Sequence, residues 1–193
     1  MGILLVRRDE RAPTIGGVEK IAAEALQAKA VLPGSATVQV LFVCLGNICR
    51  SPIAEGVFRH LVAEAGLDNV ISTNSAGTGP WHVGRPPDKR GQATAARHGI
   101  DIGHQRARQI AADDFTAFDY VLAMDGDNLK TLLRAAPTEH QNRVMLFLNF
   151  GATDKGGDVP DPYYGGPKGF DDVFVLVQDA ARGLLRHIQL NDI

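Results

Sequence analysis

Cysteine is scarce in this sequence of 193 residues: only Cys44 and Cys49 are present, with four residues between them. Two cysteines this close, and no others, exclude a disulfide scaffold and a zinc site. We therefore expect a reducing, cytoplasmic setting, in which unpaired thiols persist. The six histidines show no metal-ligand spacing either, so the sequence predicts no bound metal and no cofactor.

Long apolar runs, an excess of basic charge and a dinucleotide-binding glycine motif are also missing. No apolar run approaches the length of a membrane span, and residues 1–6 are too short for the apolar core of a signal peptide. The net charge of −2 provides no basic footprint for nucleic acid. No strand–GxGxxG–helix pattern occurs. The remaining composition, 45% hydrophobic and 22% charged, is ordinary for a soluble globular protein. From the charge and the missing apolar runs, we expect neither nucleic acid nor a membrane as a partner.

Apolar runs that resemble strands alternate along the chain with stretches of helical composition. The strand-like runs are residues 38–43, 70–74, 119–124 and 144–148, and the helical stretches are residues 53–65, 90–98, 128–134 and 170–188. The last stretch follows a 3.6-residue period closely. Alternating strands and helices favour right-handed crossovers. We therefore expect an α/β fold with a four-stranded parallel sheet and helices on both faces.

The first 37 residues stand apart from this alternation. Residues 14–32 have helical periodicity, and the Pro-Gly-Ser of residues 33–35 then indicates a break. We interpret residues 1–37 as an N-terminal extension, helical or loosely ordered, and residues 38–193 as the main domain. An inert appendage is favoured because chain termini are usually poorly tied down, while a docking arm or a start-site artefact stays open.

The most informative passage follows the first strand-like run: residues 44–52 read Cys-Leu-Gly-Asn-Ile-Cys-Arg-Ser-Pro. A strand that ends in a cysteine, turns through a short loop and enters a helix places converging backbone N–H groups above a thiol. Arg50 adds a planar, permanently charged fork suited to phosphate oxygens. We expect the Ser51 side chain to cap the helix and Pro52 to occupy its first position. The passage therefore predicts an anion-binding loop with Cys44 beneath it.

This loop resembles the phosphate-binding loop of the low-molecular-weight protein tyrosine phosphatases. The similarity continues through residues 75–78, 81–85, 118–122 and 159–165. It covers about residues 38–188, which leaves only the N-terminal segment outside. The resemblance implies a metal-independent phosphatase that works through a phosphocysteine. Without it, Cys44 could be a buried cysteine at the end of a strand.

The residue types in the loop suit the cleavage of a phosphate ester. A helix terminus alone cannot lower a thiol pKa far enough, so Cys44 needs the loop N–H groups, Ser51 and Arg50 together. Cys44 would attack phosphorus while Arg50 holds the charged oxygens. The resemblance implies that Asp161, in the Asp-Pro-Tyr-Tyr element, is the general acid and then the base for water. By itself, Asp161 would be interpreted as part of an ordinary turn.

The loop also contains an asparagine whose surroundings the resemblance suggests. Asn47 suits a left-handed backbone position, which asparagine tolerates. The resemblance implies that its side chain ties the loop to three partners, namely Ser51, Ser75 and His104. It also implies that Asp125 lies behind His104. From the residues alone, His104 is more simply a structural histidine, so we expect a supporting role.

The resemblance assigns further residues to the loop and to the walls of the pocket. Phosphate binding and loop support fall to Leu45, Gly46, Ile48 and Cys49 in addition to those named above. The substrate pocket falls to Trp81, Tyr163 and Tyr164, whose aromatic faces could enclose a phenyl ring. Cys49 is not needed for the displacement, but its place in the loop suits reversible disulfide capture of an oxidised Cys44.

We therefore expect a cytoplasmic protein tyrosine phosphatase that acts as a monomer on phosphotyrosine-containing proteins or aryl phosphates. Arsenate reduction uses a similar loop, but its relay needs cysteines beyond Cys44 and Cys49. Protein-arginine phosphatases are a second alternative, although relatives of that type carry threonine where this loop has Ile48. A phosphate-binding module without activity would be favoured by loss of Cys44, Arg50 or Asp161, and all three are present.

Overall fold

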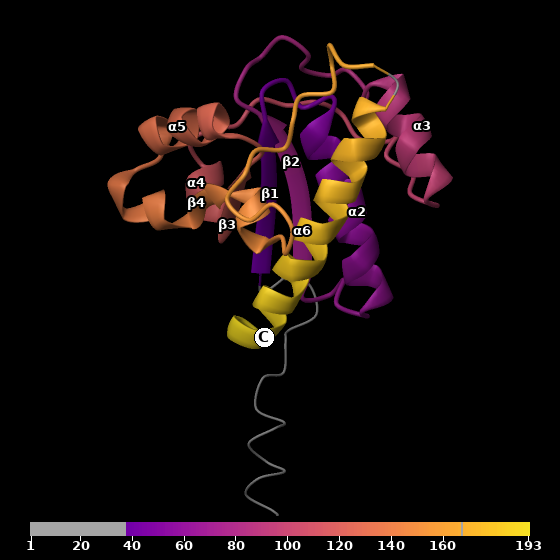
Figure 1. Ribbon diagram of the computed structural model, residues 1–193. Helices are drawn as coiled ribbons and strands as arrows, with labels where there is room; N and C mark the ends of the chain where they lie inside the picture. The colour runs from indigo at the N-terminus through magenta and orange to yellow at the C-terminus, as the bar shows by residue number, and fades with distance from the viewer. Residues whose placement is uncertain (1–37, 167) are drawn as a thin grey trace, which may run out of the picture. The chain divides into compact units, whose positions relative to one another are not determined.

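The computed structural model describes residues 38–166 and 168–193, which are built around a four-stranded parallel sheet (Figure 1). The strands are β1 (Val38–Cys44), β2 (Ile71–Gly77), β3 (Tyr120–Ala123) and β4 (Val144–Leu146). Their order across the sheet is β2-β1-β3-β4, and every pairing is parallel. The expected α/β fold is therefore confirmed. The predicted helical periodicity of residues 14–32 and the break at residues 33–35 lie outside the described residues.

Strand β1 lies between β2 and β3 and is buried on both faces. Successive side chains of a strand point to opposite faces of the sheet. Accordingly, Val40 and Phe42 belong to one apolar core, whereas Leu41 and Val43 belong to a second. Burial on both faces explains why this run is continuously apolar and does not alternate with polar residues.

Helices cover both faces of the sheet, as the alternating pattern predicts. The core that contains Phe42 is completed by α2 (Arg50–Glu64), α3 (Lys89–Arg97) and α6 (Gly169–Asn191). The second core is closed by α4 (Asp114–Ala117) and α5 (Gly126–Ala135), through Phe115 and Leu132. Figure 1 shows α2 and α6 side by side, with α5 on the other side of the sheet.

The C-terminal helix α6 confirms the helical period predicted for residues 170–188 and extends beyond it at both ends. Its apolar stripe is buried against the sheet and α2, and comprises Phe170, Val173, Phe174, Val177, Ala180, Ala181, Leu184 and Ile188. None of the described helices, α6 included, is both long enough and apolar enough to cross a membrane.

The fourth predicted strand, residues 144–148, is too long. β4 ends at Leu146, and the 3-10 helix η2 (Phe147–Phe150) follows it directly. Phe147 and Leu148 are neighbours in sequence, yet both are buried in the same core, an arrangement that the alternation of a strand forbids. The Phe147 ring packs edge-on against Phe42, with the centroids 5.1 Å apart. The sequence pattern also does not indicate α4 or the 3-10 helix η1 (Thr138–Arg143).

We expect Gly183→Ala in α6 to destabilise the protein. A Cβ at this position would collide with the Phe150 carbonyl oxygen, so α6 or η2 would have to move. Alanine normally stabilises a helix interior by about 1 kcal/mol relative to glycine, but overpacking costs about 1–3 kcal/mol. Urea unfolding should therefore show a net loss of stability. Gln189→Ala, at an exposed position of the same helix, is the control. If Gly183→Ala stabilised the protein, the close approach of α6 to the Phe150 carbonyl would be contradicted.

Candidate active site

Residues 45–49 form the loop between the end of β1 and the start of α2, at the carboxyl edge of the sheet. The strands β2 and β3 lie on opposite sides of β1, so the direction in which the sheet is built reverses at this strand. Such a switch point leaves a crevice beyond the carboxyl ends of the strands. The loop therefore occupies the predicted place, directly after the first strand of the described chain.

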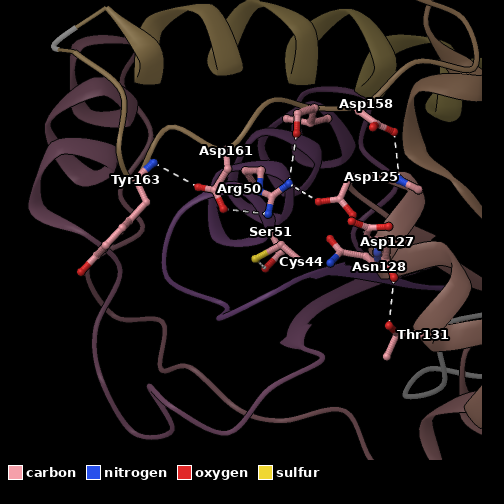
Figure 2. A network of polar contacts seen from close by, with 12 residues as sticks. Cys44, Arg50, Ser51, Asp125, Asp127, Asn128, Thr131, Asp158, Asp161 and Tyr163 are labelled. Carbon is pink, nitrogen blue, oxygen red and sulfur yellow. Dashed lines mark hydrogen bonds and ion pairs between the residues drawn. The ribbon is translucent and has the colours of Figure 1, made fainter.

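The Cys44 thiol lies beneath this loop, and Cys44 is 2% exposed. Its Sγ lies 3.1 Å from the Ser51 hydroxyl oxygen. The Asn47 backbone N–H donates to the same sulfur over 3.3 Å. Figure 2 shows Cys44 and Ser51 next to each other, close to Arg50. The thiolate is the reactive form of a cysteine, and the Asn47 N–H and the Arg50 guanidinium are placed to interact with an anion at this position.

The prediction that Ser51 caps α2 and that Pro52 is its first residue is wrong. α2 begins at Arg50, and its N-cap residue, Cys49, makes no side-chain capping hydrogen bond. The Ser51 hydroxyl lies within the first turn and donates to the Ala76 carbonyl of β2 over 3.3 Å. Because its partners are the thiol, the Asn47 amide and the neighbouring strand, Ser51 serves the site and not the helix terminus.

Asn47 holds the loop in shape. Its φ is +55°, in the left-handed region expected for it, and its side chain is buried. Its Nδ2 donates to the hydroxyl oxygens of Ser51 and Ser75, each over 2.9 Å. Its Oδ1 accepts from the Arg108 backbone N–H over 2.9 Å. Strand β2 runs to Gly77, past the end predicted at residue 74, and this extension places Ser75 beside the loop.

The predicted contact between Asn47 and His104, with Asp125 behind it, is also wrong. His104 is exposed, and no hydrogen bond connects it with Asn47 or Asp125 in the part of the chain that the structure describes. The Arg108 backbone N–H takes the place expected for His104, and Asp125 instead pairs with Arg50. A backbone donor leaves no trace in the side-chain pattern, so the sequence could not reveal it.

Two carbonyl groups of the loop are engaged by backbone N–H groups outside it. Gly79 donates to the Leu45 carbonyl over 2.9 Å, and Asp88 donates to the Ile48 carbonyl over 2.7 Å. Gly77 permits this close approach, because a Cβ there would lie only 2.9 Å from the Leu45 carbonyl oxygen. With these carbonyls held on the outside, the loop N–H groups can converge on an anion.

Arg50 begins α2, and its side chain is 4% exposed and lies between two carboxylates (Figure 2). Its Nη1 donates to Asp125 Oδ2 over 2.5 Å and to the Val159 carbonyl over 3.1 Å. Its Nη2 donates to Asp161 Oδ2 over 3.0 Å. Burial alone would lower the pKa of Arg50, but the negative charges of Cys44, Asp125 and Asp161 outweigh it and raise that pKa above its ordinary value. Arg50 therefore carries a permanent positive charge beside the thiol.

Asp161 lies on the chain segment that precedes α6, and its side chain is 40% exposed. One carboxylate oxygen accepts from Arg50, and the other accepts from the Tyr163 backbone N–H over 3.0 Å. The fold thus brings together Arg50 and Asp161, which are 111 residues apart in sequence. The carboxylate is held near the loop and remains accessible to solvent.

A cavity of about 370 Å³ opens above the loop. Trp81 and Tyr164 are 68% and 93% exposed, so they form its rim, and Tyr163 is 41% exposed. His82 also lines the cavity, although the sequence analysis does not single it out. The sequence did hold a signal for His82, because it follows Trp81 within a segment that resembles the family. The cavity brings together most of the predicted residues: Cys44, Leu45, Gly46, Ile48, Cys49, Arg50, Trp81, Asp161, Tyr163 and Tyr164.

Cys49 differs from Cys44 in its surroundings. Burial, followed by the charge of Asp88, raises the pKa of Cys49 to about 12. Its thiol is therefore protonated near neutral pH and is a weak nucleophile there. Both cysteines are free. The disulfide capture of an oxidised Cys44 by Cys49 stays a prediction.

Glu55 on α2 supports the loop from behind, and the sequence analysis missed it. Its carboxylate accepts from the Ser75 hydroxyl over 2.6 Å and from Arg59 Nη1 over 3.1 Å. Burial raises the pKa of Glu55, although the Ser75 hydrogen bond and the charges of Arg59 and His104 oppose this effect. Through Ser75 and Asn47, the carboxyl group is connected to the hydroxyl that contacts the thiol. A glutamate inside a helical stretch is usually a surface residue, so the sequence offered no signal.

The described residues contain no group of three or more His, Cys, Asp or Glu side chains arranged to hold a metal ion. The site offers a buried thiol with two hydrogen-bonding neighbours, a fixed cation and a partly exposed carboxylate. These groups can bind a phosphate dianion, attack it and exchange a proton with its leaving group.

Comparison with known proteins identifies what the chain resembles. A sequence model described as low molecular weight phosphotyrosine protein phosphatase matches residues 39–192. The low molecular weight phosphotyrosine protein phosphatase of Schizosaccharomyces pombe is 45% identical over 152 residues, which cover 78% of this chain and 97% of that protein. The low molecular weight protein-tyrosine-phosphatase of Streptomyces coelicolor is 46% identical over 156 residues, which cover 79% and 94%. A crystal structure of a protein tyrosine phosphatase from Entamoeba histolytica has a TM-score of 0.78 and 36% identity, covering 81% of this chain and 99% of that chain.

The raised pKa of Glu55 predicts a pH-dependent stability. The folded protein binds the Glu55 proton more tightly than the unfolded chain, so stability falls as pH rises from the ordinary value of 4.5 through the raised value. Glu55→Gln keeps an acceptor for Ser75 and has no such proton. In urea unfolding from pH 4 upward, the stability of Glu55→Gln relative to wild type should therefore increase. Glu139→Gln, an exposed change in η1, is the control. A constant or falling difference would contradict the burial argument.

Proposed function

The chain belongs to the low molecular weight phosphotyrosine protein phosphatase family, and on this premise we propose how its residues carry out the reaction. It is a protein tyrosine phosphatase that works through a cysteine nucleophile and without a metal ion. Cys44 is the nucleophile, Arg50 holds the phosphate group, and Asp161 is the general acid and base. One observation carries this assignment. The Cys44 sulfur contacts the Ser51 hydroxyl and the Asn47 N–H, next to the N-terminus of α2.

In the first step, the Cys44 sulfur forms a bond to phosphorus while the bond from phosphorus to the phenolic oxygen breaks. Phosphate oxygens compete with Asp161 for the Arg50 guanidinium, which can bind them in a bidentate manner. A general acid acts from its protonated form, so this step requires a proton on the Asp161 carboxyl group. Asp161 can then donate its proton to the departing phenolate.

In the second step, water attacks the phosphocysteine. Asp161, now deprotonated, accepts the proton from this water, and the bond between phosphorus and the Cys44 sulfur breaks. Inorganic phosphate leaves, and the thiolate returns to its contacts with Ser51 and the Asn47 N–H. Arg50 and the loop N–H groups hold the phosphate oxygens in both steps, where charge is redistributed.

The walls of the cavity support an aryl phosphate as substrate. Trp81 and Tyr163 provide aromatic faces for a phenyl ring, and Leu45 and Ile48 add apolar surface from the loop itself. We propose that phosphotyrosine-containing proteins and small aryl phosphates are the substrates. The exposed rim leaves room for the peptide that carries the phosphotyrosine, because Tyr164 is 93% exposed.

We further propose that residues 38–193 form the catalytic domain and that a single chain suffices. The support is that every proposed reacting group lies between Cys44 and Tyr164, within the segment matched by the family model, residues 39–192. A reducing compartment such as the cytoplasm suits this chemistry, because the Cys44 thiol must stay unoxidised to act.

Cys44→Ser should reduce the hydrolysis of an aryl phosphate by about 1,000-fold or more, because it removes the nucleophile. Arg50→Ala should cause a comparably severe loss, because it removes the cation that holds the phosphate. Wild-type turnover should persist in EDTA. Arg134→Ala, an exposed arginine at the end of α5, is the control and should stay within about two-fold of wild type. Substantial turnover by Cys44→Ser would exclude the thiol mechanism.

Asp161→Ala should harm substrates according to the basicity of their leaving groups. A phenolate with a pKa of about 10 needs the proton, so its release should slow by about 100-fold, whereas an activated leaving group should be affected far less. The measurement is kcat/KM over a series of aryl phosphates, because this ratio reports the steps up to release of the phenolate and not the later hydrolysis of the phosphocysteine. The exposed Asp172→Ala is the control. An equal loss across the series would remove Asp161 from the role of acid.

A further inference from the structure

Arg90, which the proposed reaction does not use, connects α3 with the chain segment that carries Asp161. It lies in the first turn of α3, and its guanidinium lies over the Phe170 ring, 4.8 Å from the centroid. Its Nη1 and Nη2 each donate to the Tyr163 carbonyl over 3.3 Å, across 73 residues of sequence. The same guanidinium lies 5.7 Å from the centroid of the Tyr163 ring. The Arg90 guanidinium therefore contacts both the backbone and the side chain of Tyr163, which lies on the segment that carries Asp161.

Asp88 holds the guanidinium of Arg90 in place. Its carboxylate accepts from Arg90 Nε over 3.0 Å and from Nη2 over 2.9 Å. The hydrogen bond from the Arg90 side chain is the main reason why the pKa of Asp88 lies below its ordinary value. The Asp88 backbone N–H donates to the Ile48 carbonyl in the phosphate-binding loop. One short segment thus contacts the phosphate-binding loop through its backbone and the acid-bearing segment through its side chains.

The Tyr163 backbone completes the connection to the acid. Its N–H donates to Asp161 Oδ1 over 3.0 Å, as Figure 2 shows, while its carbonyl accepts from Arg90. A continuous path of hydrogen bonds therefore joins the phosphate-binding loop to the segment that carries the acid. It runs through Ile48, Asp88, Arg90, Tyr163 and Asp161.

We infer that Arg90 is a positioning residue for the general acid: it sets the place of the Asp161 carboxylate relative to the Cys44 thiol. The inference rests on the proposed role of Asp161. Proton transfer requires the donor within hydrogen-bonding reach of the leaving oxygen, and a displacement of about 1 Å can cost about 100-fold in rate. Loss of Arg90 leaves the thiol and Arg50 in place, so it impairs mainly the substrates whose leaving groups need the proton.

The test is Arg90→Met, which keeps an unbranched apolar side chain over Phe170 and removes every hydrogen-bond donor of the guanidinium. For a leaving group with a pKa of about 10, kcat/KM should fall about 10-fold or more, while kcat/KM for an activated aryl phosphate should stay within about two-fold of wild type. Arg97→Ala is the matched control. Arg97 lies on the same helix and pairs with Asp171, outside the lining of the cavity, so this variant should keep the wild-type dependence.

A double variant shows whether Arg90 acts through Asp161. In an Asp161→Ala background, Arg90→Met should cost no further activity, because the acid that it positions is gone. An equal loss for all leaving groups, no loss, or a fully additive loss overturns the inference. If Arg90→Met is poorly folded by circular dichroism, Arg90→Leu, which also lacks a side-chain donor, provides the same comparison. The proposed function fails if Asp161→Ala itself shows no leaving-group dependence, and only the inference fails if Asp161→Ala shows it and Arg90→Met does not.

Discussion

The Asn47 amide group, buried in the left-handed turn between β1 and α2, joins three separate parts of the chain by hydrogen bonds. It contacts the hydroxyl of Ser51 in α2, the hydroxyl of Ser75 in β2 and the backbone of Arg108. An amide that is buried this deeply costs free energy unless its partners are present, so the surrounding network must form completely. The turn, the strand end and the first turn of the helix are therefore fixed together around the thiol.

The buried charge of Arg50 also depends on partners from distant parts of the chain. A buried guanidinium such as that of Arg50 is unfavourable without compensation, and Asp125 and Asp161 supply it from two distant segments. Asp125 also accepts from the Asn128 backbone N–H and so caps α5, which fixes its position independently of Arg50. Asp161 is more exposed, so phosphate oxygens can replace its carboxylate as a partner of Arg50. One carboxylate thus anchors the arginine, and the other can take part in chemistry.

The placement of these groups follows from the topology of the sheet. Parallel strands end at the same edge, and the central position of β1 brings the segments that follow β2 and β3 to either side of its loop. The start of α3 contributes the contacts of Asp88 and Arg90 on one side. The start of α5 contributes Asp125 on the other. The candidate active site is therefore assembled from loops that the sheet brings to one edge and that direct hydrogen bonds then join.

The sequence by itself determined the features that depend on local patterns. The apolar period of residues 170–188 predicted α6, because a helix buries one stripe wherever it packs. Contiguous residues, from Cys44 to Arg50, predicted the phosphate-binding loop, because the end of a strand, a short turn and the start of a helix are all encoded within that one stretch. The family resemblance added Asp161, which no local pattern would have separated from an ordinary turn.

Tertiary structure decided the features in which a side chain had a choice of partners. Ser51 could have capped α2, but the thiol, Asn47 and the Ala76 carbonyl surround it in the fold. The Arg108 backbone, and not His104, contacts Asn47. β4 ends at Leu146, because Phe147 and Leu148 both pack into one core. In each case the local sequence allows more than one arrangement, and contacts formed in the fold determine which one occurs.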